Sequence, residues 1–294
     1  MTPRSPVRLS RRAFLAGSAG AALLAACGGG DDAGPTTSGA PRPEAQPGPS
    51  LVKFFGDDFL AAGIEQRATF GVGDAEGVVS GDVPASLDFT ILSEEAAIAG
   101  PVTVASRRDG LPRPYFPLRF TVPQPGFYTA STEIDGQPVE ATFGVVDRAE
   151  VALPQVGESL PALDTPTVSD GRGVNPICTA EPQCPLHDVT LTEALTEGRP
   201  VALLVSTPKF CQVAICGPVL DVLLTRQPTF PGVRMIHAEV YTDETTEILA
   251  PVIDVFGLTY EPALFIASSA GILTARLDNI YDTTELTEAL QAVG

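Results

Sequence analysis

An apolar run that leads into two cysteines constrains the fold of this 294-residue chain more than any other feature. Residues 200–206 (Pro-Val-Ala-Leu-Leu-Val-Ser) have the composition of a buried strand, and Cys211 follows soon after them. Cys216 comes five residues later, and a helical apolar pattern then runs through residues 219–224. A cysteine placed between a strand and a helix lies near the unpaired N–H groups of the helix, which favour the thiolate. The pattern predicts a redox-active pair in which Cys211 attacks and Cys216 resolves.

The spacing of Cys211 and Cys216 leaves a second interpretation open. Residues five apart in a regular helix are separated by about 7.5 Å along its axis and by roughly 140° around it. That separation exceeds the reach of a disulfide, so a bond between them requires the first turn of the helix to unwind. A permanent structural disulfide that ties the loop to the helix is the alternative to an exchanging pair.

Cys178 and Cys184 lie in a proline-broken segment before the apolar run. An irregular segment of an exported protein gains stability from a covalent link, so we expect a structural disulfide between these two cysteines. A relay pair that passes its oxidation state to Cys211 is the alternative.

The two histidines of the chain, His187 and His237, raise the question of a metal. Together with the cysteines they could form a copper site similar to that of Sco-type copper chaperones, because thiolates suit Cu(I). Most isolated histidines are ordinary core or loop residues. We therefore expect neither a metal nor a cofactor, and copper handling is a third hypothesis.

The first 27 residues predict the location of the protein. Residues 10–15 (Ser-Arg-Arg-Ala-Phe-Leu) are typical of a twin-arginine export signal, and an apolar segment too short to span a bilayer follows. Residues 24–27 (Leu-Ala-Ala-Cys) resemble a bacterial lipobox, in which the cysteine is acylated. We expect residues 1–27 to be an export signal and Cys27 to anchor a lipoprotein on the extracytoplasmic face of the cell membrane. An ordinary signal peptide, with Cys27 incidental, is the alternative.

The charge of the chain excludes two classes of partner. The chain has 18 basic and 36 acidic residues, and four of the basic residues belong to the expected signal. The remainder, with 14 basic against 36 acidic residues, has a net charge of −22. Such a surface repels nucleic acid and anionic lipid headgroups, so we expect no nucleic-acid partner and a membrane contact through the lipid anchor alone.

Composition divides the rest of the chain into three parts. Residues 28–50 are rich in glycine and proline and are expected to be a disordered linker. Residues 51–150 predict an all-β, immunoglobulin-like sandwich, because short apolar or alternating runs recur between turn residues and Asp135-Gly136 is a strong hairpin signal. The six runs are 68–72, 86–92, 102–105, 118–122, 127–134 and 139–146.

Residues 151–294 open with a proline-rich segment and then alternate between helical and strand patterns. A capping box at residues 190–193 (Thr-Leu-Thr-Glu) opens a short helix. Further helices are expected at 211–226, 243–256 and 282–293, and strands at 201–206, 233–241, 263–267 and 272–277. The alternation predicts an α/β domain with a mixed central sheet flanked by helices.

Residues 156–294 resemble the thioredoxin superfamily. The resemblance rests on the cysteine between the first core strand and its helix, on the lead-in segments at 156–163 and 191–205, and on residues 256–266, which are similar to the segment that carries the family's cis-proline. It implies that Pro262 is a cis-proline and that the backbone of Glu261 presents itself to a substrate strand. The spacing of four residues between the cysteines is similar to that of some peroxiredoxins, but the chain departs from their Pro-x-x-x-Thr-x-x-Cys frame.

The resemblance implies thiol–disulfide exchange on extracytoplasmic protein thiols and disulfides, catalysed by Cys211 and Cys216. Two other hypotheses come from different classes. One is a non-catalytic binding or structural module with permanent disulfides, and the other is a copper-binding metallochaperone.

Overall fold

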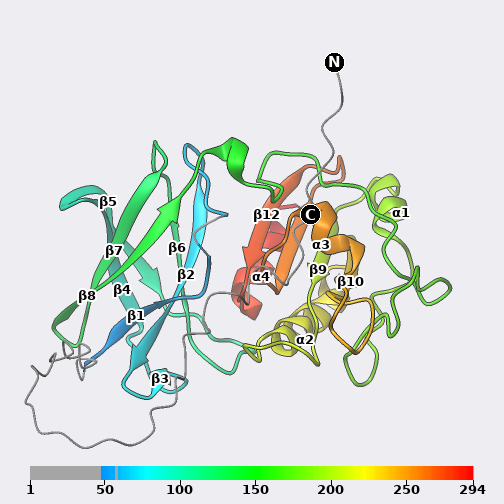
Figure 1. The fold of residues 1–294 in the computed structure, drawn as a ribbon, viewed down its shortest axis with the longest axis horizontal. Helices are drawn as coiled ribbons and strands as arrows, with labels where there is room; N and C mark the ends of the chain where they lie inside the picture. Colours follow the sequence, from blue (N-terminus) through cyan, green and yellow to red (C-terminus); the bar gives the residue numbers. More distant parts are fainter. Residues whose placement is uncertain (1–47, 57–58, 294) are drawn as a thin grey trace, which may run out of the picture. The chain divides into compact units, whose positions relative to one another are not determined.

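The computed structural model describes residues 48–56 and 59–293 (Figure 1). The expected export signal, the expected lipidation site Cys27 and residues 28–47 of the expected linker lie outside the described residues. Among the described residues, no helix is both long enough and apolar enough to cross a membrane. The first strand begins at Ser50, so the last residue of the expected linker already belongs to a sheet.

Eight strands between residues 50 and 145 form two antiparallel sheets. One sheet contains β1 (Ser50–Lys53), β2 (Gln66–Asp74), β3 (Gly77–Val78) and β6 (Phe116–Phe120). The other has the order β5 (Ala96–Ala105), β4 (Ser86–Ser93), β7 (Gly126–Ile134), β8 (Gln137–Val145). Each of the six runs expected to be strands overlaps one of these elements.

The β7–β8 hairpin turns at Asp135-Gly136, as the sequence predicted. Ile134 pairs with Gln137, which leaves a two-residue loop. Asp135 and Gly136 have φ values of 53° and 75°, and positive values at both central positions match the right-handed twist of the flanking strands.

The C-terminal sheet has the order β10 (Arg234–Ala238), β9 (Val201–Val205), β11 (Ala263–Ala267), β12 (Leu273–Asp278). β9 is parallel to β10 and antiparallel to β11, and β11 is antiparallel to β12. The helices are α1 (Leu191–Thr196), α2 (Cys216–Arg226), α3 (Pro251–Phe256) and α4 (Thr283–Gln291), and short 3₁₀ turns lie at Arg148–Glu150 and Gln227–Thr229.

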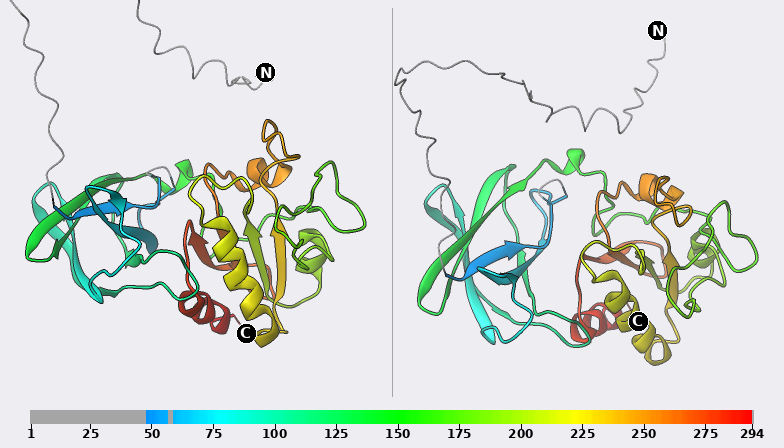
Figure 2. Two further views of the ribbon diagram at one scale, coloured as in Figure 1. Left: turned by 90° about the horizontal axis from the view of Figure 1, so that it is seen from below. Right: turned by 60° about the horizontal axis from the view of Figure 1, so that its bottom comes forward.

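Alternate residues of β9 and β11 contribute to different hydrophobic clusters, which explains why these strands are apolar throughout. Val201, Leu203 and Val205 belong to the cluster that contains apolar side chains of α1 and α3. Ala202 and Leu204 belong to the cluster that contains those of α2 and α4, which lie side by side in both views of Figure 2. Because strand side chains alternate between faces, helices cover both faces of the sheet. This arrangement is a thioredoxin-like fold, as the sequence predicted.

The helix expected at 243–256 and the strand expected at 233–241 are both shorter than their patterns suggested. The helix expected at 243–256 begins only at Pro251, which occupies the first helical position. Proline disfavours helical backbone at the residue before it, so the helix does not extend back through Ala250. Residues 243–249 form turns and contribute to two isolated bridges. The strand expected at 233–241 contracts to β10.

The capping box forms as expected: the Thr190 hydroxyl accepts from Glu193 N (3.0 Å), and the Glu193 carboxylate accepts from Thr190 N (2.9 Å).

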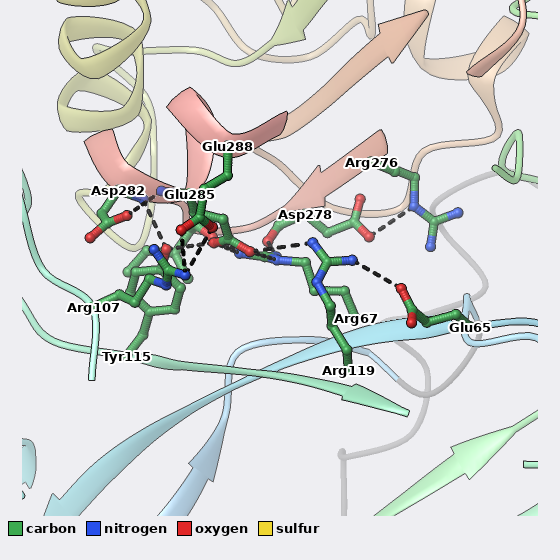
Figure 3. Close-up of polar contacts among 11 residues, drawn as sticks. Glu65, Arg67, Arg107, Tyr115, Arg119, Arg276, Asp278, Asp282, Glu285 and Glu288 are labelled. Atoms are coloured by element: carbon green, nitrogen blue, oxygen red, sulfur yellow. Dashed lines mark hydrogen bonds and ion pairs between the residues drawn. The ribbon is translucent and has the colours of Figure 1, made fainter. Parts of the chain in front are cut away.

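A buried ion pair joins β2 to α4 (Figure 3). Arg67 Nε donates to Glu285 Oε1 (2.6 Å), and its other nitrogens reach Glu285 Oε2 and the carbonyl oxygens of Asp278 and Ile280. The Tyr115 hydroxyl donates to Glu285 Oε2 (2.6 Å). Burial opposes ionisation of Glu285, but the Arg67 guanidinium outweighs it and lowers the pKa of the carboxyl below its usual value. The pair therefore stays charged and fixes the contact between the two elements.

Candidate functional site

Cys211 and Cys216 form a disulfide, with Cα atoms 6.0 Å apart. Helix α2 begins at Cys216 and not at Cys211, where the sequence placed its start. Residues 212–214 make an exposed turn in which Ala214 has a φ of 53°. The first turn of the expected helix is thus unwound, as a disulfide between residues five apart requires.

The two sulfurs of this disulfide have different surroundings. Cys216 is fully buried, whereas Cys211 is partly exposed and follows the loop after β9. The N–H of Cys216, the first residue of α2, donates to Cys211 Sγ (3.3 Å). The N–H groups of a helix's first turn stabilise negative charge, so the more accessible sulfur is also the one placed to become a thiolate.

The carboxyl group of Glu261 lies beside the buried sulfur. Glu261 precedes β11, and its peptide bond to Pro262 is cis, as the sequence resemblance implied. Its Oε2 lies 3.6 Å from Cys216 Sγ and accepts the backbone N–H of Thr207 (2.7 Å). Burial raises the pKa of Glu261 to about 7, although the Thr207 N–H partly opposes the shift. A carboxyl with this pKa can take a proton from a neighbouring thiol or return one near neutral pH.

From the sequence, Glu239 and Glu261 are candidates for a buried proton shuttle near the cysteines, with exposed or salt-bridged side chains as the favoured alternative. The structure brings the side chain of Glu261 to the disulfide. The one available signal was its position next to the expected cis-proline, which brings the residue before Pro262 to the cysteines. Cys216 and Glu261 are 45 positions apart in the sequence, so no local pattern indicates their contact.

Lys209 and Phe210, which precede the disulfide, are engaged elsewhere. Lys209 Nζ pairs with Glu244 (2.6 Å) and lies over the Phe210 ring. Phe210 makes an edge-to-face contact with Tyr241. Neither side chain is held against Cys211, so the helix end, and not the Lys209 ammonium, is the positive feature at that sulfur.

The structural disulfide expected between Cys178 and Cys184 is absent. Both cysteines are free and buried. Their sulfurs instead converge with the rings of His187 and His237, and one ligand atom from each of the four residues lies within 4.8 Å of all the others. The expectation was wrong because the pairing was inferred within one segment, whereas His237 reaches the sulfurs from β10.

We call the set of Cys178, Cys184, His187 and His237 the Cys–His cluster. Most of its contacts involve the sulfur of Cys184. Cys184 Sγ lies 3.2 Å from His187 Nε2 and 3.5 Å from His237 Nδ1. Cys178 Sγ accepts the backbone N–H of Cys184 (3.4 Å). The neighbouring Cys184 thiol and the two imidazoles stabilise the thiolate of Cys178 and lower the pKa of this cysteine. The cluster does not include Cys211 or Cys216, so the pooled six-residue copper site considered from sequence does not form.

Thr179 connects the Cys–His cluster to the disulfide region. Its backbone N–H and its hydroxyl both donate to Glu239 Oε1, at 2.5 and 2.8 Å. The same hydroxyl accepts the backbone N–H of Lys209 (3.2 Å) and lies 3.4 Å from the Thr207 hydroxyl. The loop that carries Cys178 and Cys184 therefore holds the segment that leads from β9 to Cys211.

Comparisons with known proteins give matches only among solved structures. No family model matches the chain, and no curated protein matches it. The C-terminal domain of a putative thiol-disulfide oxidoreductase from Bacteroides thetaiotaomicron is 10% identical, covers 47% of this chain and 95% of its own, and has a TM-score of 0.34. A thiol:disulfide interchange protein of the thioredoxin family from Chlorobium tepidum TLS is 11% identical over 47% of this chain and 97% of its own, also with a TM-score of 0.34. Tandem immunoglobulin domains of titin match 40% of this chain and 54% of their own at 15% identity, with a TM-score of 0.23.

Proposed function

We propose that this protein catalyses thiol–disulfide exchange on extracytoplasmic proteins. The observation that carries the proposal is the asymmetric disulfide. Its outer sulfur, on Cys211, accepts a helix N-terminal N–H, and its buried sulfur, on Cys216, lies beside the carboxyl of Glu261. A purely structural disulfide needs neither a thiolate-stabilising donor nor a proton acceptor.

The reaction begins with the reduced pair. The Cys211 thiolate attacks one sulfur of a substrate disulfide, which forms a mixed disulfide and releases the other substrate sulfur as a thiolate. Glu261 then takes the proton of the Cys216 thiol, and the Cys216 thiolate attacks Cys211 Sγ. The substrate leaves as a dithiol once both of its thiolates are protonated, one by Glu261 and the other by solvent, and the enzyme keeps the Cys211–Cys216 disulfide. Two electrons pass from enzyme to substrate, and the reverse sequence oxidises a substrate dithiol.

The backbone before the cis-proline is the proposed docking site for the substrate strand. Glu261 and Pro262 lie at the start of β11, and the Glu261 side chain reaches the disulfide. A peptide that pairs with this backbone would bring its own sulfur close to Cys211. Main-chain pairing of this kind gives affinity with little sequence preference.

The proposed location follows from the N-terminal sequence. Residues 1–27 direct export by the twin-arginine route, and a lipid on Cys27 anchors the protein to the membrane. The two antiparallel sheets of residues 50–145 would then be an immunoglobulin-like module between the anchor and the redox domain. The net charge of −22 outside the expected signal disfavours nucleic acid as a partner.

A redox titration of the full chain carrying Cys27→Ser tests the activity. The protein is equilibrated in glutathione buffers of graded potential, its free thiols are alkylated, and the modified peptides are identified by mass spectrometry. We expect Cys211 and Cys216 to open together and reversibly within the range of known oxidoreductases, roughly −120 to −270 mV. A pair that opens only after denaturation would show that the disulfide is structural and would refute the proposal.

A further inference from the structure

We propose that the Cys–His cluster is a zinc site in which Cys178, Cys184, His187 and His237 bind one Zn²⁺. The disulfide-exchange reaction uses none of these residues, so the inference stands apart from the proposed function. It rests on the geometry, the burial and the hydrogen bonds of the four side chains.

The separations between the ligand atoms suit a tetrahedral ion. With Zn–S bonds of about 2.3 Å and Zn–N bonds of about 2.0 Å, sulfur and nitrogen ligands lie roughly 3.5 Å apart. The two S···N separations at Cys184 are 3.2 and 3.5 Å, and no pair of ligand atoms exceeds 4.8 Å.

The hydrogen bonding of His237 leaves a ligand lone pair aimed at the cluster. Its Nε2 lies 3.0 Å from the carbonyl oxygen of Ser206, which can only accept, so Nε2 carries the proton. In the neutral ring Nδ1 is then unprotonated, and it is this atom that faces Cys184 Sγ. A second hydrogen bond that fixes the tautomer and orientation of a ligating imidazole is a general feature of zinc sites.

Burial favours a divalent ion over an unoccupied set of thiols and imidazoles. The four residues are between 0 and 5% exposed. Cys184 Sγ lies within hydrogen-bond distance of two ring nitrogens, and one ion can bind the sulfur and both nitrogens at once. Two thiolates and one Zn²⁺ are together neutral, so the ion satisfies all four donors without leaving a net charge in the interior.

The ligand set indicates zinc and a structural role. Two sulfurs and two imidazole nitrogens in a tetrahedral arrangement are typical of zinc, and four protein ligands leave no open position for a substrate. The ion would tie the loop of Cys178 and Cys184 to β10 through His237. Thr179 would then be held in place, and through it the segment before Cys211. Zinc would thus supply the stability that the sequence analysis assigned to a disulfide.

Metal analysis of the full chain carrying Cys27→Ser is the test. The protein is purified without added metal, stripped with a chelator under reducing conditions, and titrated with Zn²⁺ and, as a spectroscopic probe, with Co²⁺. We expect one ion per chain and, with Co²⁺, the absorption of a tetrahedral site with thiolate-to-metal charge transfer. Adding Cys211→Ser and Cys216→Ser is the matched control, because it removes the other two cysteines and keeps the four ligands. Loss of binding in this control would overturn the assignment.

Variants of single residues in the Cys–His cluster test whether these side chains bind the ion. Cys184→Ser and His237→Gln should each weaken Zn²⁺ binding by at least roughly 10²-fold. Because either change can also unfold the domain, alkylation of the unaltered cluster provides an independent measurement. Zn²⁺ should protect Cys178 and Cys184 from alkylation, and a chelator should expose them. A metal-free disulfide between Cys178 and Cys184 in the folded protein would refute the proposal, and so would tight binding of Cu(I) without binding of Zn²⁺ or Co²⁺.

Discussion

Oε2 of Glu261 lies 3.6 Å from Sγ of Cys216, the buried sulfur of the Cys211–Cys216 disulfide. The carboxyl reaches this position because the chain turns into β11 directly after it, and the Thr207 N–H holds it there. Its pKa of about 7 allows it to change protonation state in the pH range in which a thiol must lose its proton before attacking.

Replacing Glu261 with glutamine should slow the resolving step. In the unaltered protein the rate at which the mixed disulfide decays should rise as pH increases through about 7, because the carboxylate form is the proton acceptor. Glu261→Gln should remove this rise and lower the rate at pH 8 by roughly 10²-fold. Single-turnover kinetics with a peptide disulfide measures the effect. Glu244→Gln, which removes an exposed acid near the same loop, is the control and should leave the profile unchanged.

The same substitution should change how stability depends on pH. Between pH 4.5 and about 7 the folded protein keeps a proton on Glu261 that the unfolded chain has released, so the folded state binds more protons and stability falls as pH rises. Glu261→Gln should remove this fall and raise the free energy of unfolding at pH 8 by roughly 1–3 kcal/mol. Urea denaturation of the oxidised proteins at pH 5 and pH 8 tests the prediction. Equal pH dependence in the two proteins would contradict it.

Serine substitutions at the two cysteines should have different outcomes. Cys216→Ser keeps the accessible Cys211 but removes the resolving thiol, so a mixed disulfide with the substrate should accumulate. Cys211→Ser should form no such adduct, because the remaining sulfur is fully buried. Non-reducing electrophoresis with mass spectrometry distinguishes the two. Trapping through Cys216 and not through Cys211 would reverse the assigned roles.

Removing one partner of the buried ion pair between Arg67 and Glu285 should strongly destabilise the protein. Arg67→Met leaves the Glu285 carboxylate without its cation and should lower the free energy of unfolding by about 3–5 kcal/mol. The double variant Arg67→Met/Glu285→Leu should lose less, because no uncompensated charge remains. Arg199→Met, which breaks an ion pair nearer the surface, should cost at most about 1 kcal/mol. Denaturant titrations compare the three, and an Arg67→Met protein as stable as the Arg199→Met control would contradict the prediction.

Alanine substitutions at Gly257 and at Gly198 should separate the cost of close packing from the cost of left-handed backbone. Both have left-handed backbone, with φ of 63° and 69°. A Cβ on Gly257 would lie 2.6 Å from the Cβ of Ala152 and 3.0 Å from its carbonyl carbon, whereas a Cβ on Gly198 would meet nothing within 4 Å. Gly198→Ala should cost about 1 kcal/mol from backbone strain alone, and Gly257→Ala about 1–3 kcal/mol more from overpacking. Thermal unfolding measures both, and equal losses would show that the contact with Ala152 relaxes freely.

Local patterns predicted much of the fold because they act over a few residues. The β7–β8 hairpin follows from Asp135-Gly136, and α1 begins where the Thr190–Glu193 capping box places it. The errors lie where a distant or steric constraint overrides the pattern. Cys216 starts α2 because the bond to Cys211 unwinds the preceding turn, and α3 starts late because Pro251 excludes helix before it.

The sequence by itself determined the cysteine pair between a buried strand and a helix, the proline at 262 and the division into a β-rich part and a thioredoxin-like part. Each of these follows from short-range periodicity or from the chemistry of single residues. Only the tertiary structure decided that Glu261 contacts Cys216 and that His237 meets Cys178, Cys184 and His187. These contacts join residues 45 to 59 positions apart, and their partners are selected by the pairing of β9 with β10 and β11, which no local pattern specifies.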